Sequence, residues 1–78
     1  MKYRKTIALL YVYDLLLLEK KVAKEDVMRK LELSEISFWR YIQDIRAFLT
    51  EFDPGKELVY HKQEGTYELV NAKTDWMK

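Results

Sequence analysis

The hydrophobic pattern between residues 3 and 19 predicts a long first helix. This stretch contains no glycine or proline and is rich in leucine, which favours helix formation. Helical periodicity sorts its side chains into two stripes, one of Ile7, Leu10, Asp14 and Leu17 and one of Leu9, Val12, Tyr13 and Leu16. Asp14 is the only charged residue between positions 7 and 18. We therefore expect this helix to be covered on more than one side.

Two amphipathic segments predict a second and a third helix joined by a tight turn. Residues 24–31 place apolar side chains at helical spacing, and so do residues 35–50. The core stripe predicted for the third helix consists of Phe38, Ile42, Ile45 and Leu49. Ser34 stands directly before this helix, where its hydroxyl can accept a backbone N–H as an N-cap. About three residues thus separate the two helices.

The C-terminal third of the chain predicts a β-hairpin. Pro54-Gly55 is a strong turn signal, and two β-rich runs follow it at residues 57–61 and 66–70, separated by a short segment that ends in Gly65. We expect the hairpin to span about residues 56–70 and to be followed by a tail over residues 71–78, in which Trp76 is a docking residue. One face of the hairpin is expected to cover the helices with Leu58, Tyr60, Tyr67 and Leu69. Residues 20–23 are interpreted as a short connection.

Together these elements predict one small domain that is mainly α with a small β-hairpin. Their order is helix, helix, tight turn, helix, hairpin. That is the order of a winged helix-turn-helix, with three helices and a two-stranded wing, in which the third helix can enter the major groove of DNA.

Composition narrows the range of functions. A chain of 78 residues forms one domain, and its 49% hydrophobic residues can build a core without disulfides, since it has no cysteine. The single histidine, His61, cannot form a metal site alone, and no acid–base pair, nucleophile set or glycine-rich phosphate loop is present. We expect no enzymatic activity, no cofactor and no small-molecule ligand. The apolar run 7–18 is too short to cross a bilayer, so a cytoplasmic protein without a membrane partner is expected.

Residues 22–46 resemble the helix-turn-helix of DeoR-type and WYL-associated bacterial transcription regulators. That family has a serine cap, a serine or threonine three residues later, an arginine, and two core aliphatic residues; the matching positions here are Ser34, Ser37, Arg40, Ile42 and Ile45. The segments Leu58-Val59-Tyr60 and Gly65-Thr66-Tyr67-Glu68-Leu69 are similar to the family's wing. The resemblance covers about residues 4–70 and implies a regulator that binds duplex DNA. The chain departs from the family at Glu35, Ile36 and Tyr41, where basic or small polar residues, and then an acidic residue, are usual.

The candidate DNA-binding residues are polar, basic or aromatic side chains of the third helix, the wing and the N-terminus: Ser37, Trp39, Arg40, Gln43, Arg46, Lys62 and Arg4. Arginine is the commonest specific reader of guanine, and glutamine reads adenine. Each candidate also has a plainer interpretation. Arg40 can pair with Asp44 four residues later, and Trp39 can pack against the wing or anchor a protein interface. The remaining candidates can be ordinary solvated surface residues.

The net charge of +1 does not by itself indicate a polyanionic partner, and residues 34–55 carry two basic and four acidic side chains. The alternative function is therefore a winged helix that serves as a protein-interaction or dimerisation module without binding DNA. In either case the surplus of apolar residues on the first helix indicates a homodimer, and we place its interface on Leu9, Val12, Tyr13 and Leu16.

Overall fold

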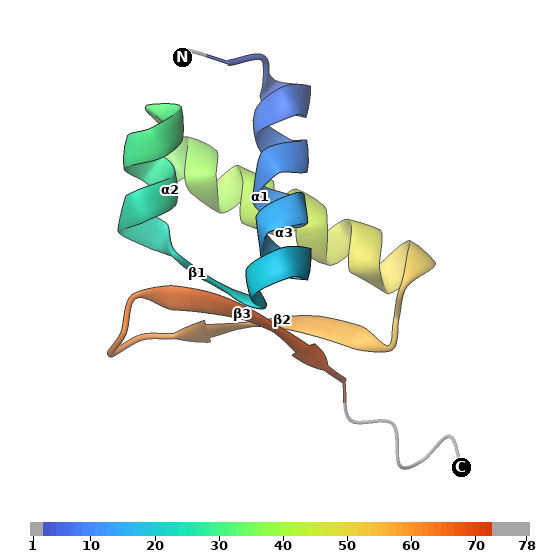
Figure 1. Cartoon of the computed structure of the whole chain (residues 1–78). Coiled ribbons are helices and arrows are strands. Elements are labelled where there is room, and N and C mark those ends of the chain that lie inside the picture. Colours follow the sequence, from blue (N-terminus) through green and yellow to red (C-terminus); the bar gives the residue numbers. More distant parts are fainter. Residues whose placement is uncertain (1–2, 73–78) are drawn as a thin grey trace, which may run out of the picture.

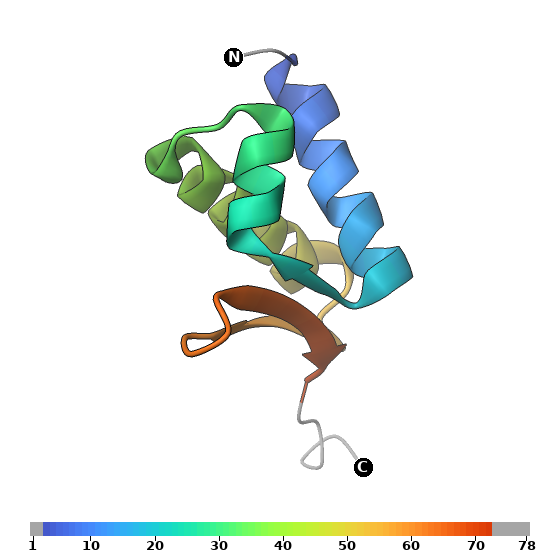
Figure 2. The same ribbon diagram turned by 60° about the vertical axis from the view of Figure 1, so that its left-hand side comes forward.

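The computed structural model describes residues 3–72 and contains three helices and a three-stranded antiparallel sheet (Figure 1). The elements follow one another as α1 (Lys5–Glu19), β1 (Lys21–Ala23), α2 (Lys24–Leu31), α3 (Glu35–Phe52), β2 (Lys56–His61) and β3 (Thr66–Asn71). The helices lie on one side of the sheet (Figures 1 and 2), and in the view of Figure 1 α1 crosses in front of α3. The predicted helix-rich chain with a C-terminal hairpin is confirmed at this level.

The sheet corrects the prediction of a two-stranded wing. Residues 21–23, interpreted above as part of a connection, form a third strand that pairs with β3 in the register Lys21↔Glu68, Val22↔Tyr67 and Ala23↔Thr66. Two backbone hydrogen bonds frame this strand, from Leu69 N to Lys20 O at 2.7 Å and from Lys24 N to Gly65 O at 3.0 Å. A three-residue strand is too short to show a period of two in the sequence, and its partner lies more than 40 residues away.

Local chemistry sets the ends of the helices. The hydroxyl of Ser34 accepts a hydrogen bond from Ser37 N at 3.1 Å, so the predicted N-cap of α3 is confirmed. The second helix ends in a left-handed residue, Glu32, and the N–H of the buried Leu33 bonds to Met28 O at 2.9 Å, as in a Schellman motif. Because Leu33 must turn inward to join the core, this cap also fixes the sharp turn between α2 and α3.

The hairpin has the predicted position, and three of the four side chains predicted to cover the helices are buried. Leu58 pairs with Leu69, and Tyr60 pairs with Tyr67, so all four side chains share one face of the sheet. Leu58, Tyr67 and Leu69 are buried, whereas Tyr60 is exposed at the edge of the helices. The turn between the strands depends on Gly65, whose φ of +68° lies in the left-handed region that glycine adopts without strain.

Two predicted boundaries shift. The third helix ends at Phe52 rather than near residue 50, and the first begins at Lys5 rather than near residue 3. The docking role predicted for Trp76, and the tail beyond residue 72, fall outside the described residues.

The core joins all six elements around α3. Its buried side chains come from one stripe of each helix, from the turn before α3 and from the sheet: Ala8, Val12, Leu16, Val22, Val27, Leu31, Leu33, Phe38, Tyr41, Ile42, Ile45, Leu49, Leu58, Tyr67 and Leu69. Four of the five buried residues of α3 are those of the predicted stripe, and the fifth is Tyr41. Tyr41, which the sequence pattern does not place in the core, is therefore a core residue.

We expect Ile42→Ala and Ile36→Ala to separate the two faces of α3. Ile42 is fully buried and Ile36 is 65% exposed, so the same substitution creates a cavity in one case only. Ile42→Ala should lower the free energy of unfolding by about 2–5 kcal/mol, and Ile36→Ala should change it by less than about 0.5 kcal/mol. Urea denaturation followed by circular dichroism measures both, and equal losses would mean that the assigned core face is wrong.

Candidate functional site

The outward face of α3 is the first part of the candidate site. Ile36, Arg40 and Gln43 recur at helical spacing on the side opposite the core, and the exposed Trp39 borders them. Arg40 is exposed and forms no hydrogen bond or ion pair within residues 3–72. In particular, the alternative pairing of Arg40 with Asp44 is not formed. The guanidinium of Arg40 is therefore available to a ligand from outside the domain.

Ser37 lies at the N-terminal end of this face but takes part in the helix cap. Its backbone N–H and its hydroxyl oxygen both contact the Ser34 hydroxyl, at 3.1 Å in each case, and Ser34 is the donor in the contact between the two hydroxyls. The Ser37 hydroxyl can still donate its own hydrogen. The cap therefore leaves the one hydrogen that a phosphate contact would use, and this role of Ser37 stays a prediction.

Arg46 turns inward, which is contrary to its prediction as a DNA contact. Its guanidinium donates to the backbone oxygen of Leu58 at 3.1 Å and lies 6.0 Å from the ring centroid of Tyr67. These contacts hold the middle of α3 against the hairpin. The side chain is half-buried and engaged with the sheet, so we assign Arg46 to the fold and not to the outward face.

The first turn of α3 is tied to the first turn of α2 by an ion pair between Lys24 and Glu35. The hydrogen bond to Lys24 holds the pKa of Glu35 below its usual 4.5, and the same bond with Glu35 raises the pKa of Lys24 above 10.5. Glu35 is one of the departures from the resembling family, and here its charge is neutralised within the domain. The same pairing occupies the ammonium group of Lys24.

Lys24 also locates the turn of the hairpin relative to α3. Its backbone N–H bonds to Gly65 O at 3.0 Å, while its side chain bonds to Glu35. Lys24 therefore lies between the turn formed by residues 62–65 and the N-terminal end of α3. Figure 2 shows the turn of the hairpin directed to the same side as the start of α3. We define residues 35–43 of α3 and the turn 62–65 as the candidate surface.

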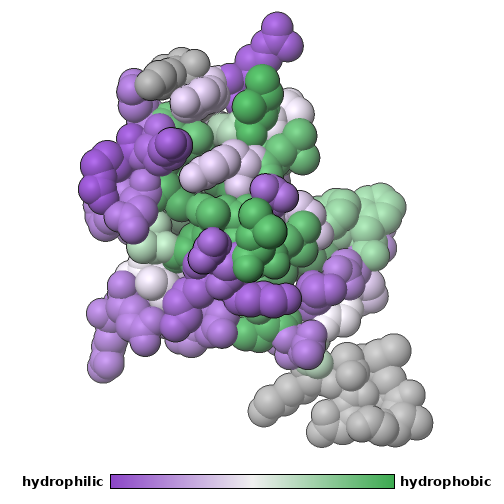
Figure 3. All heavy atoms as spheres, in the orientation of Figure 1, coloured by the Kyte–Doolittle hydropathy of each residue, from purple (hydrophilic) through white to green (hydrophobic). Residues whose placement is uncertain are grey.

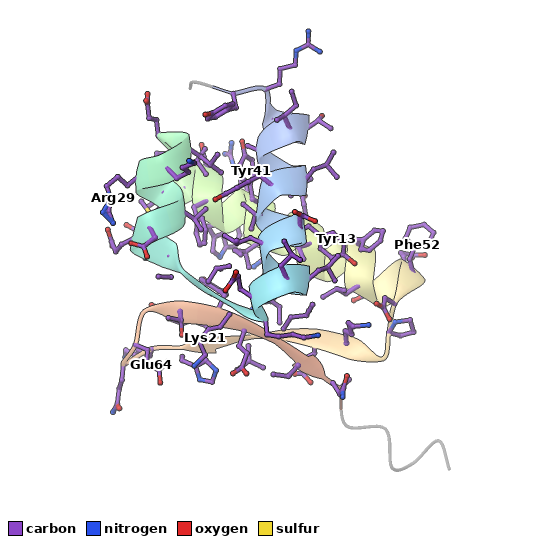
Figure 4. All side chains as sticks on the ribbon, in the orientation of Figure 1. Tyr13, Lys21, Arg29, Tyr41, Phe52 and Glu64 are labelled. Atoms are coloured by element: carbon purple, nitrogen blue, oxygen red, sulfur yellow. The ribbon has the colours of Figure 1, made fainter. Side chains whose placement is uncertain are left out.

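The charges of the hairpin turn are partly balanced within the sheet. Lys21 pairs with Glu64 at 3.1 Å, and the hydrogen bond from Lys21 lowers the pKa of Glu64. Figure 4 shows both residues at the same end of the sheet. His61 lies 2.7 Å from a carboxylate oxygen of Glu68. Lys62 is exposed and has no partner within the described residues, so it is the free cation of this turn.

Arg4 is not brought into the candidate surface. It precedes α1, at the end of that helix that lies far from the sheet (Figure 1). The structure therefore groups Ser37, Trp39, Arg40, Gln43 and Lys62 on one side and leaves Arg4 and Arg46 out of that group.

The predicted dimer interface needs a larger correction. Val12 and Leu16 are fully buried inside the domain, and Leu9 and Tyr13 are partly buried against the core. The stripe chosen for the interface is thus the inner face of α1. The exposed apolar residues of this helix belong to the other side and are Ile7, Leu10, Leu17 and Leu18.

The sequence interpretation missed Lys24 as a residue of the site. The available signal was a lysine in the first turn of the second helix and a glutamate in the first turn of the third. The structure brings these two N-terminal ends together, so the opposite charges pair. No periodicity in the hydrophobic pattern reports such a contact.

Searches against protein families, curated proteins and solved structures find no match to this chain. None of the helices within residues 3–72 combines the length and apolar character needed to span a membrane. In the same stretch, no three histidine, aspartate or glutamate side chains gather as metal ligands.

The Lys24–Glu35 pair predicts a pH-dependent contribution to stability. A carboxylate with a lowered pKa stabilises the fold above its unfolded pKa, and this contribution is lost as the pH falls through the folded pKa. Glu35→Gln should therefore lower the urea midpoint at neutral pH, and its effect should shrink as the pH falls below 4.5 and Glu35 of the wild type becomes protonated. At high pH, the stability that the pair contributes should be lost only above pH 10.5, because the hydrogen bond with Glu35 raises the pKa of Lys24.

Glu25→Gln is the matched control, because Glu25 is an exposed residue of α2 without an ion-pair partner within the described residues. If both variants gave the same midpoint at neutral pH, the pair would contribute nothing to stability.

Proposed function

We propose that this chain is a winged-helix domain that binds duplex DNA, with α3 in the major groove and the β2–β3 turn as the wing. The support from the fold is the order of the elements, the short connection between α2 and α3, and the sheet order β1-β3-β2 beside the helices. The support from the sequence is the resemblance to DeoR-type regulators over residues 4–70. A regulator of this kind acts in the bacterial cytoplasm, where its DNA lies.

The observation that carries the proposal is the free guanidinium of Arg40. It stands on the outward face of α3 next to Gln43, and residues 3–72 provide it with no partner. Arginine and glutamine present bidentate donor and acceptor groups that match the edges of guanine and adenine in the major groove. Lys62 lies on the wing and not on α3, and its ammonium group can bind a phosphate of the DNA backbone. We assign base contacts to Arg40 and Gln43 and a backbone contact to Lys62.

The charges of the surface predict weak and salt-dependent binding. Lys24 and Lys21 lie near the surface but are paired with Glu35 and Glu64. Few cations remain to displace the counterions of DNA, and the electrostatic part of the affinity grows with the number of phosphates contacted. A domain of this kind depends on base contacts, or on a second copy of the chain, for its specificity.

A second candidate function is protein recognition through the same surface. The observation in its favour is the exposure of Ile36 and Trp39 on α3, next to a first turn whose charge is balanced by the Lys24–Glu35 pair. Exposed tryptophan is enriched at the centres of protein interfaces. This candidate predicts a loss of function for Trp39→Ala and no response to salt.

Fluorescence anisotropy with labelled duplexes of mixed sequence tests the proposal through Arg40→Ala. Loss of a bidentate base contact is expected to raise the Kd by about fivefold to 150-fold, equivalent to about 1–3 kcal/mol. Arg29→Ala is the control, because Arg29 is an exposed arginine of α2 that is already paired with Asp26. It should change the Kd by less than about twofold. Absence of binding at low salt, or equal effects of the two variants, would reject the proposal.

The variant Glu35→Gln is expected to bind DNA more tightly than wild type. Removal of the carboxylate releases the Lys24 ammonium, which can then contact a phosphate near the start of α3. The plot of log K against log salt concentration should become steeper by about 0.9, the increment for one added phosphate contact. Protein recognition by the same surface predicts no such change in slope.

A further inference from the structure

The outer side of α1 carries an apolar surface that residues 3–72 leave uncovered. Ile7, Leu10, Leu17 and Leu18 are 40–72% exposed on this helix, and Phe48 and Phe52 continue the surface onto the C-terminal half of α3. We call these six residues the α1 patch. The space-filling view shows hydrophobic residues gathered on the face formed by α1 and the end of α3 (Figure 3).

The α1 patch combines a ridge with a groove. Leu10 and Leu17 form the ridge, and the groove beside it is lined by Leu9, Leu10, Tyr13, Asp44, Ile45 and Phe48. Aromatic contacts continue the wall of this groove, with ring centroids 5.3 Å apart both for Tyr13–Phe48 and for Phe48–Phe52. A ridge next to a groove of the same apolar character is self-complementary under a two-fold rotation.

The spacing of the exposed residues on α1 fits a second helix. Ile7, Leu10, Asp14 and Leu17 follow one another at three, four and three residues, the spacing of a helix–helix seam. Asp14 selects the direction of the partner helix. A parallel copy would place the two Asp14 carboxylates at the same level, whereas an antiparallel copy centred near residue 12 places each Asp14 beside a Leu10. Repulsion between like charges therefore favours the antiparallel arrangement.

The size of the α1 patch matches one half of a dimer interface. From the exposed fractions, its six side chains present roughly 450 Å² of apolar surface. Each partner in an interface of standard size contributes about 800 Å², of which about 65% is apolar when the copies are identical. The largest apolar patch on a typical monomer measures about 300–600 Å² and is often functional, and the α1 patch falls within that range.

We propose that the α1 patch is the site at which a second copy of this chain docks, with the two α1 helices antiparallel across a two-fold axis. The candidate DNA surface stays open in this arrangement. Figure 4 places Tyr13 and Phe52 toward one end of the molecule and Lys21 and Glu64, beside the hairpin turn, toward the other. Two copies would thus present two α3 helices to one duplex. The dimer does not depend on the proposed DNA binding, because it uses different residues.

Sedimentation velocity over a concentration series tests the dimer. Wild type should sediment as a dimer at high concentration, and Leu10→Lys should raise the dimer dissociation constant at least tenfold. Ile36→Lys is the matched control, because Ile36 is exposed to a similar degree on α3 but lies outside the α1 patch. It should leave the dissociation constant unchanged, and circular dichroism confirms that each variant is folded.

A gain-of-function variant makes the test independent of any loss of folding. Asp14→Leu replaces the charged member of the seam and should lower the dissociation constant severalfold. The proposal is overturned by a wild-type monomer at all concentrations, by a dimer that Leu10→Lys leaves intact, or by Asp14→Leu without effect. A dimer that forms without any DNA binding would support this inference while rejecting the proposed function.

Discussion

The burial of one side of α3 is the constraint on which the rest of the structure depends. Phe38, Ile42 and Ile45 face α1 and the sheet, and little freedom remains for the helix to rotate about its axis. The opposite side of α3 must then face outward along its whole length. Core packing therefore makes Arg40 and Gln43 point outward, and these two side chains need no contacts of their own to do so. The inward contacts of Arg46 with Leu58 and Tyr67 reinforce the same rotation.

The electrostatic organisation of the domain follows from how its ends meet. The N-terminal ends of α2 and α3 and the hairpin turn converge at Lys24. Charges at this junction are paired, which ties the hairpin and α3 into one surface but leaves few free cations. We infer that any specificity of this surface resides in a small number of side chains, with Arg40 foremost. The Lys21–Glu64 and Lys24–Glu35 pairs use two of the lysines near this surface to join its elements.

The sequence predicts the helices and the hairpin because each has a strong local signal. The period of the core stripe of α3, the Ser34 cap and the Pro54-Gly55 turn are all visible within a few residues. The strand β1 is not, because Val22 pairs with Tyr67 across most of the chain. For a similar reason, the sequence does not show which face of α1 is buried. Both of its stripes are apolar, so only the position of α3 shows that Val12 and Leu16 are inside and that Leu10 is outside. The inward turn of Arg46 likewise depends on the carbonyl of a distant strand.

The domain thus has two proposed binding surfaces on different sides, one for DNA and one for a second copy of the chain. The most direct test is a titration of the ¹⁵N-labelled protein with a duplex at low salt, followed by amide chemical shifts. We expect the largest shifts in residues 35–43 and 62–65, with little change at residues 7–18. Shifts concentrated on residues 7–18, or no shifts at all, would contradict this assignment of the two surfaces.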